Sequence, residues 1–143
     1  MRKLFALLSA VAVCALAVTA VSLAASRSTT WSAKLTAAQE IPKQTVKNVA
    51  ASGAFHATLT GKKLKWTLTF SKLTGPATAA HIHLGAMGQA GNVVVPLCGP
   101  CKSPVSGTAT LTAAVLAAAG KHLLYVNVHT AKNPNGEIRG QVG

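Results

Sequence analysis

The segment that decides the fold runs from Gly53 to Phe70 and reads GAFHATLTGKKLKWTLTF. Its apolar side chains recur at every second position on both sides of a central Gly61-Lys62 pair. They are Phe55, Ala57 and Leu59 before the pair and Leu64, Trp66, Leu68 and Phe70 after it. Successive side chains of a β-strand point to opposite faces. The segment therefore predicts two strands, each with one apolar and one polar face, joined by a tight turn.

The remaining strand-like segments follow the same pattern and are separated by proline, glycine and asparagine. They are Trp31–Thr36, Thr78–Leu84, Asn92–Leu97, Ser106–Thr112, Leu123–Thr130 and Glu137–Val142. The alanine-rich stretch after Thr112 is the one helix-like piece, with Thr112 as its expected N-cap and Gly120 at its end. We therefore predict an all-β fold, an antiparallel Greek-key sandwich or barrel of about seven or eight strands with one short helix.

The N-terminal segment has the features of a secretory leader. Arg2 and Lys3 provide a positive start, residues 4–23 are almost wholly apolar, and small residues at positions 22–26 offer a cleavage site. We predict a signal peptide over residues 1–25 and a mature protein that is secreted or held at the cell surface. The apolar stretch is also about long enough to span a bilayer. An uncleaved membrane anchor is therefore the alternative, and only then is the membrane a partner.

The charge of the chain is strongly one-sided. Fourteen lysines and arginines stand against two acids, Glu40 and Glu137, and there is no aspartate. Removing Arg2 and Lys3 with the leader leaves 12 basic residues against the two acids, a formal charge of +10. Such a charge attracts polyanions, so we expect an anionic surface polymer or an unidentified extracellular protein as partner. Aromatic platforms and arginine clusters are typical of nucleic-acid binding. The sequence has neither, so no nucleic-acid partner is expected.

Three of the five histidines lie in two of the predicted strands. His81 and His83 share one face, and His129 shares a face with Asn127. If the isoleucine and valines between them form the core, the three imidazoles lie on the outer face. Neutral imidazole is the commonest metal ligand, and three such nitrogens suit copper or zinc. The alternative is that the histidines hydrogen-bond to one another, to Asn127 or to loop backbone. We expect the other two, His56 and His122, to be structural.

These histidine segments also carry a resemblance to a known family. Ala80–Gly85, Gly91–Leu97 and Tyr125–Val142 resemble, in this order, the motifs of the CHRD domain, which is named for chordin and occurs in many secreted bacterial proteins. The resemblance covers residues 31–142. It implies a secreted β domain without a settled activity. We accordingly predict an exported CHRD domain-containing protein that acts as a non-enzymatic binding module.

A second resemblance concerns the histidines alone. The His-x-His at His81 and His83, the later His129 and the C-terminal Arg139 are similar to the copper half of copper–zinc superoxide dismutase. That likeness implies a copper ion held by the three histidines and an anion guided to it by Arg139. It does not extend to the zinc half, which needs an aspartate. A copper-binding or superoxide dismutase-like redox protein is therefore the alternative function. We also expect Glu137 and Arg139 to share a strand face and to form an exposed ion pair.

Two cysteines remain after the leader, in the sequence Cys98-Gly99-Pro100-Cys101. The same four residues occur in thioredoxin, where they need a strand-to-helix turn that lowers the thiol pKa. Here the pair lies between two predicted strands, and a secreted chain with two cysteines favours a disulfide. A disulfide that closes a loop this short contributes about 1–2 kcal/mol to the free energy of unfolding. Redox chemistry or metal binding by the thiols is the alternative.

Other catalytic patterns are missing from the sequence. The two acids lie far apart along the chain, whereas glycoside chemistry needs a carboxylate pair. A serine–histidine–aspartate triad lacks its aspartate, and there is no phosphate-binding glycine-rich loop. We therefore expect no enzymatic activity apart from the redox alternative.

Overall fold

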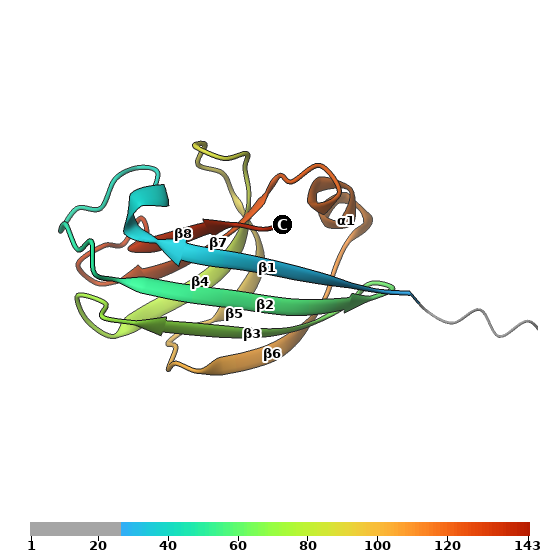
Figure 1. Cartoon of the computed structure of the whole chain (residues 1–143), viewed down its shortest axis with the longest axis horizontal. Helices are drawn as coiled ribbons and strands as arrows, with labels where there is room; N and C mark the ends of the chain where they lie inside the picture. Colours follow the sequence, from blue (N-terminus) through green and yellow to red (C-terminus); the bar gives the residue numbers. More distant parts are fainter. Residues whose placement is uncertain (1–26) are drawn as a thin grey trace, which may run out of the picture.

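The computed structural model describes residues 27–143, so the predicted leader lies outside the described residues. Eight antiparallel strands form one sheet in the order β5-β4-β7-β8-β1-β2-β3-β6. The strands are β1 (Ser28–Thr36), β2 (Ser52–Thr60), β3 (Lys63–Ser71), β4 (Ala77–Leu84), β5 (Val93–Cys98), β6 (Val105–Thr110), β7 (Leu124–Thr130) and β8 (Ile138–Gln141). Figure 1 labels them. The prediction of about eight antiparallel strands is confirmed.

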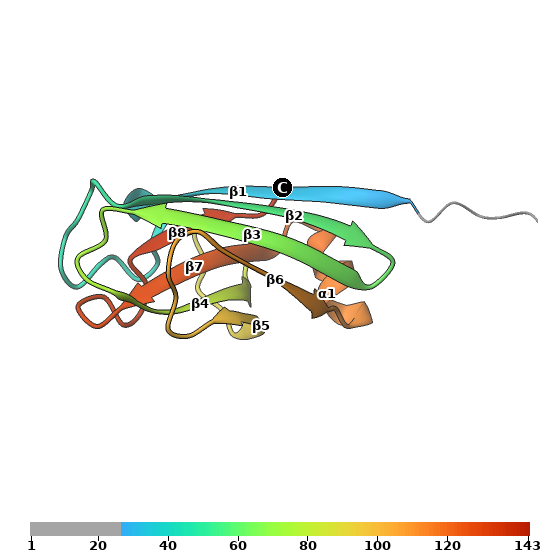
Figure 2. The ribbon, with the colours of Figure 1, turned by 90° about the horizontal axis from the view of Figure 1, so that it is seen from below.

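The sheet curls into a nearly closed barrel with two layers. Strands β1, β2 and β3 form one layer, and β4, β5 and β7 lie opposite it (Figure 2). After the successive strands β4, β5 and β6, the chain returns and β7 pairs with β4. This return connection is typical of a Greek key. The loop between β5 and β6 brings the two ends of the sheet toward each other.

The core lies between the two layers and follows the predicted alternation. Strand β3 has the burial pattern eBeBeBeie, in which its buried residues Leu64, Trp66 and Leu68 occupy every second position. Phe55 on β2 and Ile82 on β4 are fully buried and belong to the same cluster. One side of each strand therefore forms the core, and the other side faces solvent or the loops.

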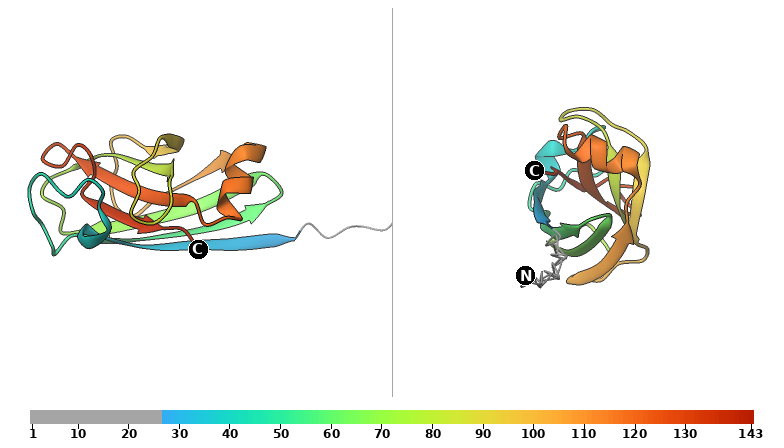
Figure 3. Two further views of the ribbon diagram at one scale, coloured as in Figure 1. Left: turned by 90° about the horizontal axis from the view of Figure 1, so that it is seen from above. Right: turned by 90° about the vertical axis from the view of Figure 1, so that its right-hand side faces the viewer.

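The short helix closes one end of the barrel (Figure 3). Helix α1 (Ala113–Ala119) begins after Thr112, whose hydroxyl accepts a hydrogen bond from the Val115 backbone N–H at 3.3 Å, and Gly120 is its C-cap. The sixth predicted strand ran to Thr112, but β6 ends at Thr110, because Thr112 is used as the helix cap. A 3-10 turn, η1 (Ala37–Gln39), follows β1 and was not predicted. Within residues 27–143, no helix combines the length and apolar character that a membrane span requires.

Candidate metal centre

The three predicted histidines lie on the outer face of two neighbouring strands. Strands β4 and β7 pair so that His81 lies opposite Asn127, His83 opposite Tyr125 and Ala79 opposite His129. The alternate residues Ile82, Val126 and Val128 are fully buried in the core. Because side chains alternate along each strand, the imidazoles must lie on the other face. The sequence pattern therefore predicted their positions correctly.

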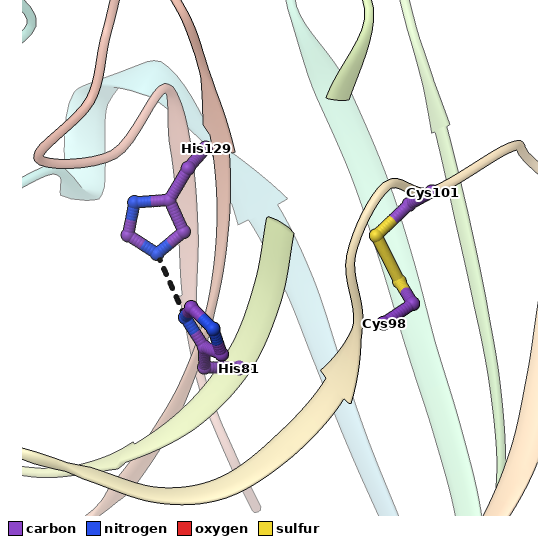
Figure 4. Close-up of a disulfide and its surroundings, with 4 residues drawn as sticks. All are labelled: His81, Cys98, Cys101 and His129. Atoms are coloured by element: carbon purple, nitrogen blue, oxygen red, sulfur yellow. Dashed lines mark hydrogen bonds between the residues drawn. A yellow bond between two sulfur atoms is a disulfide. The ribbon is translucent and has the colours of Figure 1, made fainter. Parts of the chain in front are cut away.

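The three imidazole rings converge on one another. His81 and His129 are in contact (Figure 4), with His81 Nδ1 3.2 Å from His129 Nε2. The ring centroid of His83 lies 5.5 Å from that of His81 and 5.8 Å from that of His129. One nitrogen from each ring lies within 4.8 Å of the other two. Four-coordinate zinc with bonds of about 2.05 Å places its ligand nitrogens about 3.4 Å apart. One pair already has about this spacing, and the third ring has to move closer by at most about 1.4 Å.

Two backbone carbonyls fix the tautomers of two of these histidines. His83 Nδ1 lies 2.9 Å from the Gly91 carbonyl oxygen, and His129 Nδ1 lies 2.9 Å from that of Pro134. A carbonyl can only accept, so each Nδ1 carries the proton and each Nε2 presents a lone pair. His81 Nδ1 is then the donor to His129 Nε2. Carbonyl bonds of this kind orient the histidines of known metal sites.

The imidazoles are held in the neutral form that metal binding needs. Burial lowers the pKa of His129 to about 4, although the Pro134 carbonyl bond acts in the opposite direction. Burial also lowers the pKa of His81 and that of His83, and the positive charge of Arg139 adds to the effect at His83. At neutral pH, therefore, no imidazolium group has to be deprotonated before a cation binds to the three histidines.

These shifts predict a maximum of stability near neutral pH in the ion-free protein. The folded pKa values of the three histidines lie below 6.5, so their contribution is complete above pH 6.5 and is lost as pH falls toward 4. Glu40 has the opposite pH dependence. Its folded pKa of about 8 lies above its ordinary 4.5, so its contribution to the free energy of unfolding is complete below pH 4.5 and is lost as pH rises through 8. Below pH 6.5 His129 opposes Glu40 down to about pH 4, and His81 and His83 add to the effect of His129, so stability falls as the pH is lowered.

Urea titrations with a chelator present, at pH 5, 7 and 9, measure this profile. We expect His129→Gln to flatten the acid limb and Glu40→Gln to flatten the alkaline limb. A free energy of unfolding that keeps rising from pH 7 to pH 9 would contradict the assignment to Glu40.

Loops cover the outer face beside the histidines. Tyr125 stacks on His83 with ring centroids 4.8 Å apart and an interplanar angle of 11°, and its hydroxyl bonds to the Gly91 backbone. The Arg139 guanidinium lies 3.5 Å from the Tyr125 ring centroid and donates to the Ala86 carbonyl oxygen at 2.9 Å. The segment from Gly85 to Gly91 thereby holds a stack of arginine, tyrosine and histidine in place. His83 is 8% exposed as a result.

The expected ion pair between Glu137 and Arg139 is wrong. Both residues are buried rather than exposed, and their side chains have different partners. The Glu137 carboxylate accepts hydrogen bonds from the Thr74 backbone and hydroxyl, the Thr130 hydroxyl and the Asn48 amide, at 2.6 to 2.9 Å. Burial raises the pKa of Glu137, but these bonds together outweigh it and hold the pKa below its ordinary value. These donors satisfy the Glu137 carboxylate, so its charge is stabilised without an ion pair to Arg139.

Unpartnered polar atoms gather beside the histidines. Among residues 27–143, the buried side-chain atoms without a hydrogen-bond partner are Glu40 Oε1, His83 Nε2, Asn127 Oδ1 and Arg139 Nη1. Asn127 Nδ2 donates to Glu40 Oε2 at 3.1 Å, and burial raises the pKa of Glu40 to about 8, so this carboxyl group is mostly neutral at pH 7. Buried polar atoms are usually paired. These unpaired atoms make this face a candidate ligand site, and the lone pair of His83 Nε2 is directed as a metal ligand requires.

Glycine is required at one position of this network. Gly136 has φ +136°, and a Cβ there would lie 2.5 Å from Asn127 Nδ2 and from Glu40 Oε2. Sequence reasoning marked the residues between Thr130 and Glu137 only as a break between two predicted strands. It also missed Glu40 and Tyr125, because their link to the histidines depends on loop packing rather than on a strand pattern.

The other predicted site residues lie apart from the histidines or beneath a loop. Cys98 at the end of β5 and Cys101 in the following loop form a disulfide, as predicted (Figure 4). His56 is exposed on β2, and His122 is exposed after α1. Arg139 is 1% exposed, so an incoming anion reaches it only if the covering loop moves. The anion-guiding role stays a prediction.

The fold and site define a class of protein, an eight-stranded Greek-key barrel with a histidine cluster on its outer face. A comparison with protein-family models matches the CHRD domain over residues 31–142, so the chain belongs to the CHRD domain family. No curated protein and no solved structure gave a significant match. The predicted family is confirmed.

Proposed function

We propose that this CHRD domain protein is an exported binding module that holds one transition-metal ion on His81, His83 and His129. The observation that carries the proposal is the convergence of three neutral imidazoles, with one nitrogen from each within 4.8 Å of the others. The unpartnered Nε2 of His83 supports it, because a buried lone pair without a donor is costly.

Copper(II) is the ion we expect to bind most tightly. Three imidazole nitrogens suit both copper and zinc, and among divalent ions the affinity of a given nitrogen site is highest for copper. The ligand nitrogens are His83 Nε2, His129 Nε2 and His81 Nδ1. The ion replaces the hydrogen bond between His81 and His129, and the proton on His81 Nδ1 moves to Nε2 of the same ring. The carbonyls of Gly91 and Pro134 keep the other two rings oriented.

Binding rather than catalysis is the function we favour. The two acids of the chain lie in buried networks, Glu40 with Asn127 and Glu137 with Thr74, Thr130 and Asn48. Both carboxyl groups are buried, and neither makes a hydrogen bond to one of the three histidines. A redox role of the same site is the second candidate, favoured by the buried guanidinium of Arg139 with its unpartnered Nη1.

Titration of the purified mature protein with copper(II) tests the proposal. We expect saturation at one ion per chain, because the three nitrogens form a single site. Calorimetry gives the stoichiometry, and the disappearance of copper-free histidine ring signals by NMR shows which rings bind. Saturation without changes at His81, His83 and His129 would place the ion elsewhere and refute the site.

Export is the other part of the proposal and is tested separately. The apolar N-terminal stretch and the small residues after it support a cleavable leader. We expect exported material to begin near Ala25 or Ser26, as read by N-terminal sequencing. Recovery of the intact chain from Met1 in the membrane fraction would favour the anchor instead.

A further inference from the structure

A polar surface of uniform composition covers the opposite layer of the barrel. The outward-facing side chains of β1, β2, β3 and β6, which we call the hydroxyl–lysine face, are almost all serine, threonine or lysine. This layer is turned away from β4 and β7, which carry the histidines (Figure 2). The inference therefore does not depend on metal binding.

The strand register aligns these side chains into rows across the sheet. Thr30 pairs with Thr58, Thr58 with Lys65, and Lys65 with Thr108, which makes one row over four strands. Neighbouring strands lie about 4.8 Å apart, so such a row is about 14 Å long. Each hydroxyl group can both donate and accept a hydrogen bond. The rows therefore present a flat array of groups that match the hydroxyls of sugars.

A parallel row lies one pleat further along and borders a hollow. Ser32 pairs with His56, His56 with Thr67, and Thr67 with Ser106. Members of both rows line a hollow of about 720 Å³. The face is thus shallow and open, and it suits an extended chain better than a small enclosed molecule.

The electrostatics of the face select an anion. Lys34, Lys63 and Lys65 are exposed on it. Glu40 and Glu137 are the only acids of the chain, and each is 0% exposed. No acidic side chain of the protein therefore offsets the surface lysines, and their field favours a polymer that carries regular negative charge.

We propose that the hydroxyl–lysine face binds an extended anionic polysaccharide, with lysines pairing to its acidic groups and serine and threonine hydroxyls bonding to its sugar hydroxyls. A nucleic acid fits this face less well, because single strands bind through stacking on exposed aromatic rings. Trp31 and Trp66 lie under the face and are buried, 8% and 4% exposed.

Binding of polygalacturonate at low salt tests the role of the lysines. The face variant replaces Lys34 by serine and Lys63 and Lys65 by threonine, which strands accept well. The control variant replaces the exposed loop lysines Lys47, Lys121 and Lys132 by serine and has the same net charge. We expect the affinity of the face variant to fall at least tenfold and that of the control variant to change by less than about threefold. Charges in contact with the polymer contribute more than distant charges, which salt screens. Equal losses in the two variants would overturn the proposal.

A second arm tests the hydroxyl groups at unchanged charge. Thr58→Val with Thr67→Val removes two hydroxyls from the face while keeping the branched shape of each side chain. We expect several-fold weaker binding to polygalacturonate and no change toward polyglutamate, which has the charge without the sugar. Sugar recognition would be overturned if the natural chain bound polygalacturonate and polyglutamate equally well and the two valine substitutions left both affinities unchanged. Preferential binding of single-stranded DNA over polygalacturonate would also overturn the proposal.

Discussion

Replacing His83 by alanine is expected to weaken copper(II) binding by at least about a hundredfold. Loss of a residue that only orients a metal ligand typically costs 10–100-fold in affinity, and His83 supplies one of three proposed ligand nitrogens. Its ring is fixed on one side by the Gly91 carbonyl and on its flat face by Tyr125, so no other side chain can take its position. Competition with a chromophoric chelator at pH 7.5 measures the affinity.

His56→Ala is the matched control, since it removes an exposed histidine from a strand that does not carry the site. Its copper affinity should equal that of the natural chain. Thermal unfolding of both variants with chelator present separates loss of binding from loss of fold. If His83→Ala binds copper as tightly as the control does, the ion is held elsewhere and the proposed centre is wrong.

Replacing Glu137 by alanine is expected to lower the free energy of unfolding by on the order of 4 kcal/mol, because it leaves four buried or partly buried donors without an acceptor and each such donor costs about 1–3 kcal/mol. The carboxylate accepts from Thr74 and Asn48, which lie in two separate loops, and from Thr130 at the end of β7, and it is fully buried. Alanine leaves these donors buried without an acceptor. A loss of this size is a large part of the stability of a domain of this length.

The measurement is urea unfolding at pH 7, and Glu137→Gln is the control. Glutamine keeps one carbonyl acceptor, and its amide can donate to the hydroxyls of Thr74 and Thr130 once they rotate. We therefore expect it to lose clearly less than alanine does. The alanine variant should also weaken copper binding, but less than His83→Ala, because Glu137 holds the turn whose Pro134 carbonyl orients His129. A loss below about 1 kcal/mol in Glu137→Ala would show that the network is not structural.

Local patterns in the sequence were enough to predict the strands and their faces. Alternation from Gly53 to Phe70 placed Leu64, Trp66 and Leu68 in the core, as the structure does. The same rule placed His81, His83 and His129 on the outer face, because a side chain two positions away must point to the same side. Helix α1 was equally predictable, since its capping threonine and terminal glycine lie in the segment itself.

The sequence by itself therefore determined the class of fold, the family motifs and the three histidines as one candidate site. Only the tertiary structure decided what covers that site and what the two acids do. Alternation tells which face a residue occupies but not what lies above it, so an exposed pair was expected where Glu137 and Arg139 are both buried. Apart from Thr130, the partners of Glu137 lie 63 and 89 positions away, and the Ala86 carbonyl that accepts from Arg139 lies 53 positions away. Such contacts depend on where long loops fold back, which no local spacing encodes.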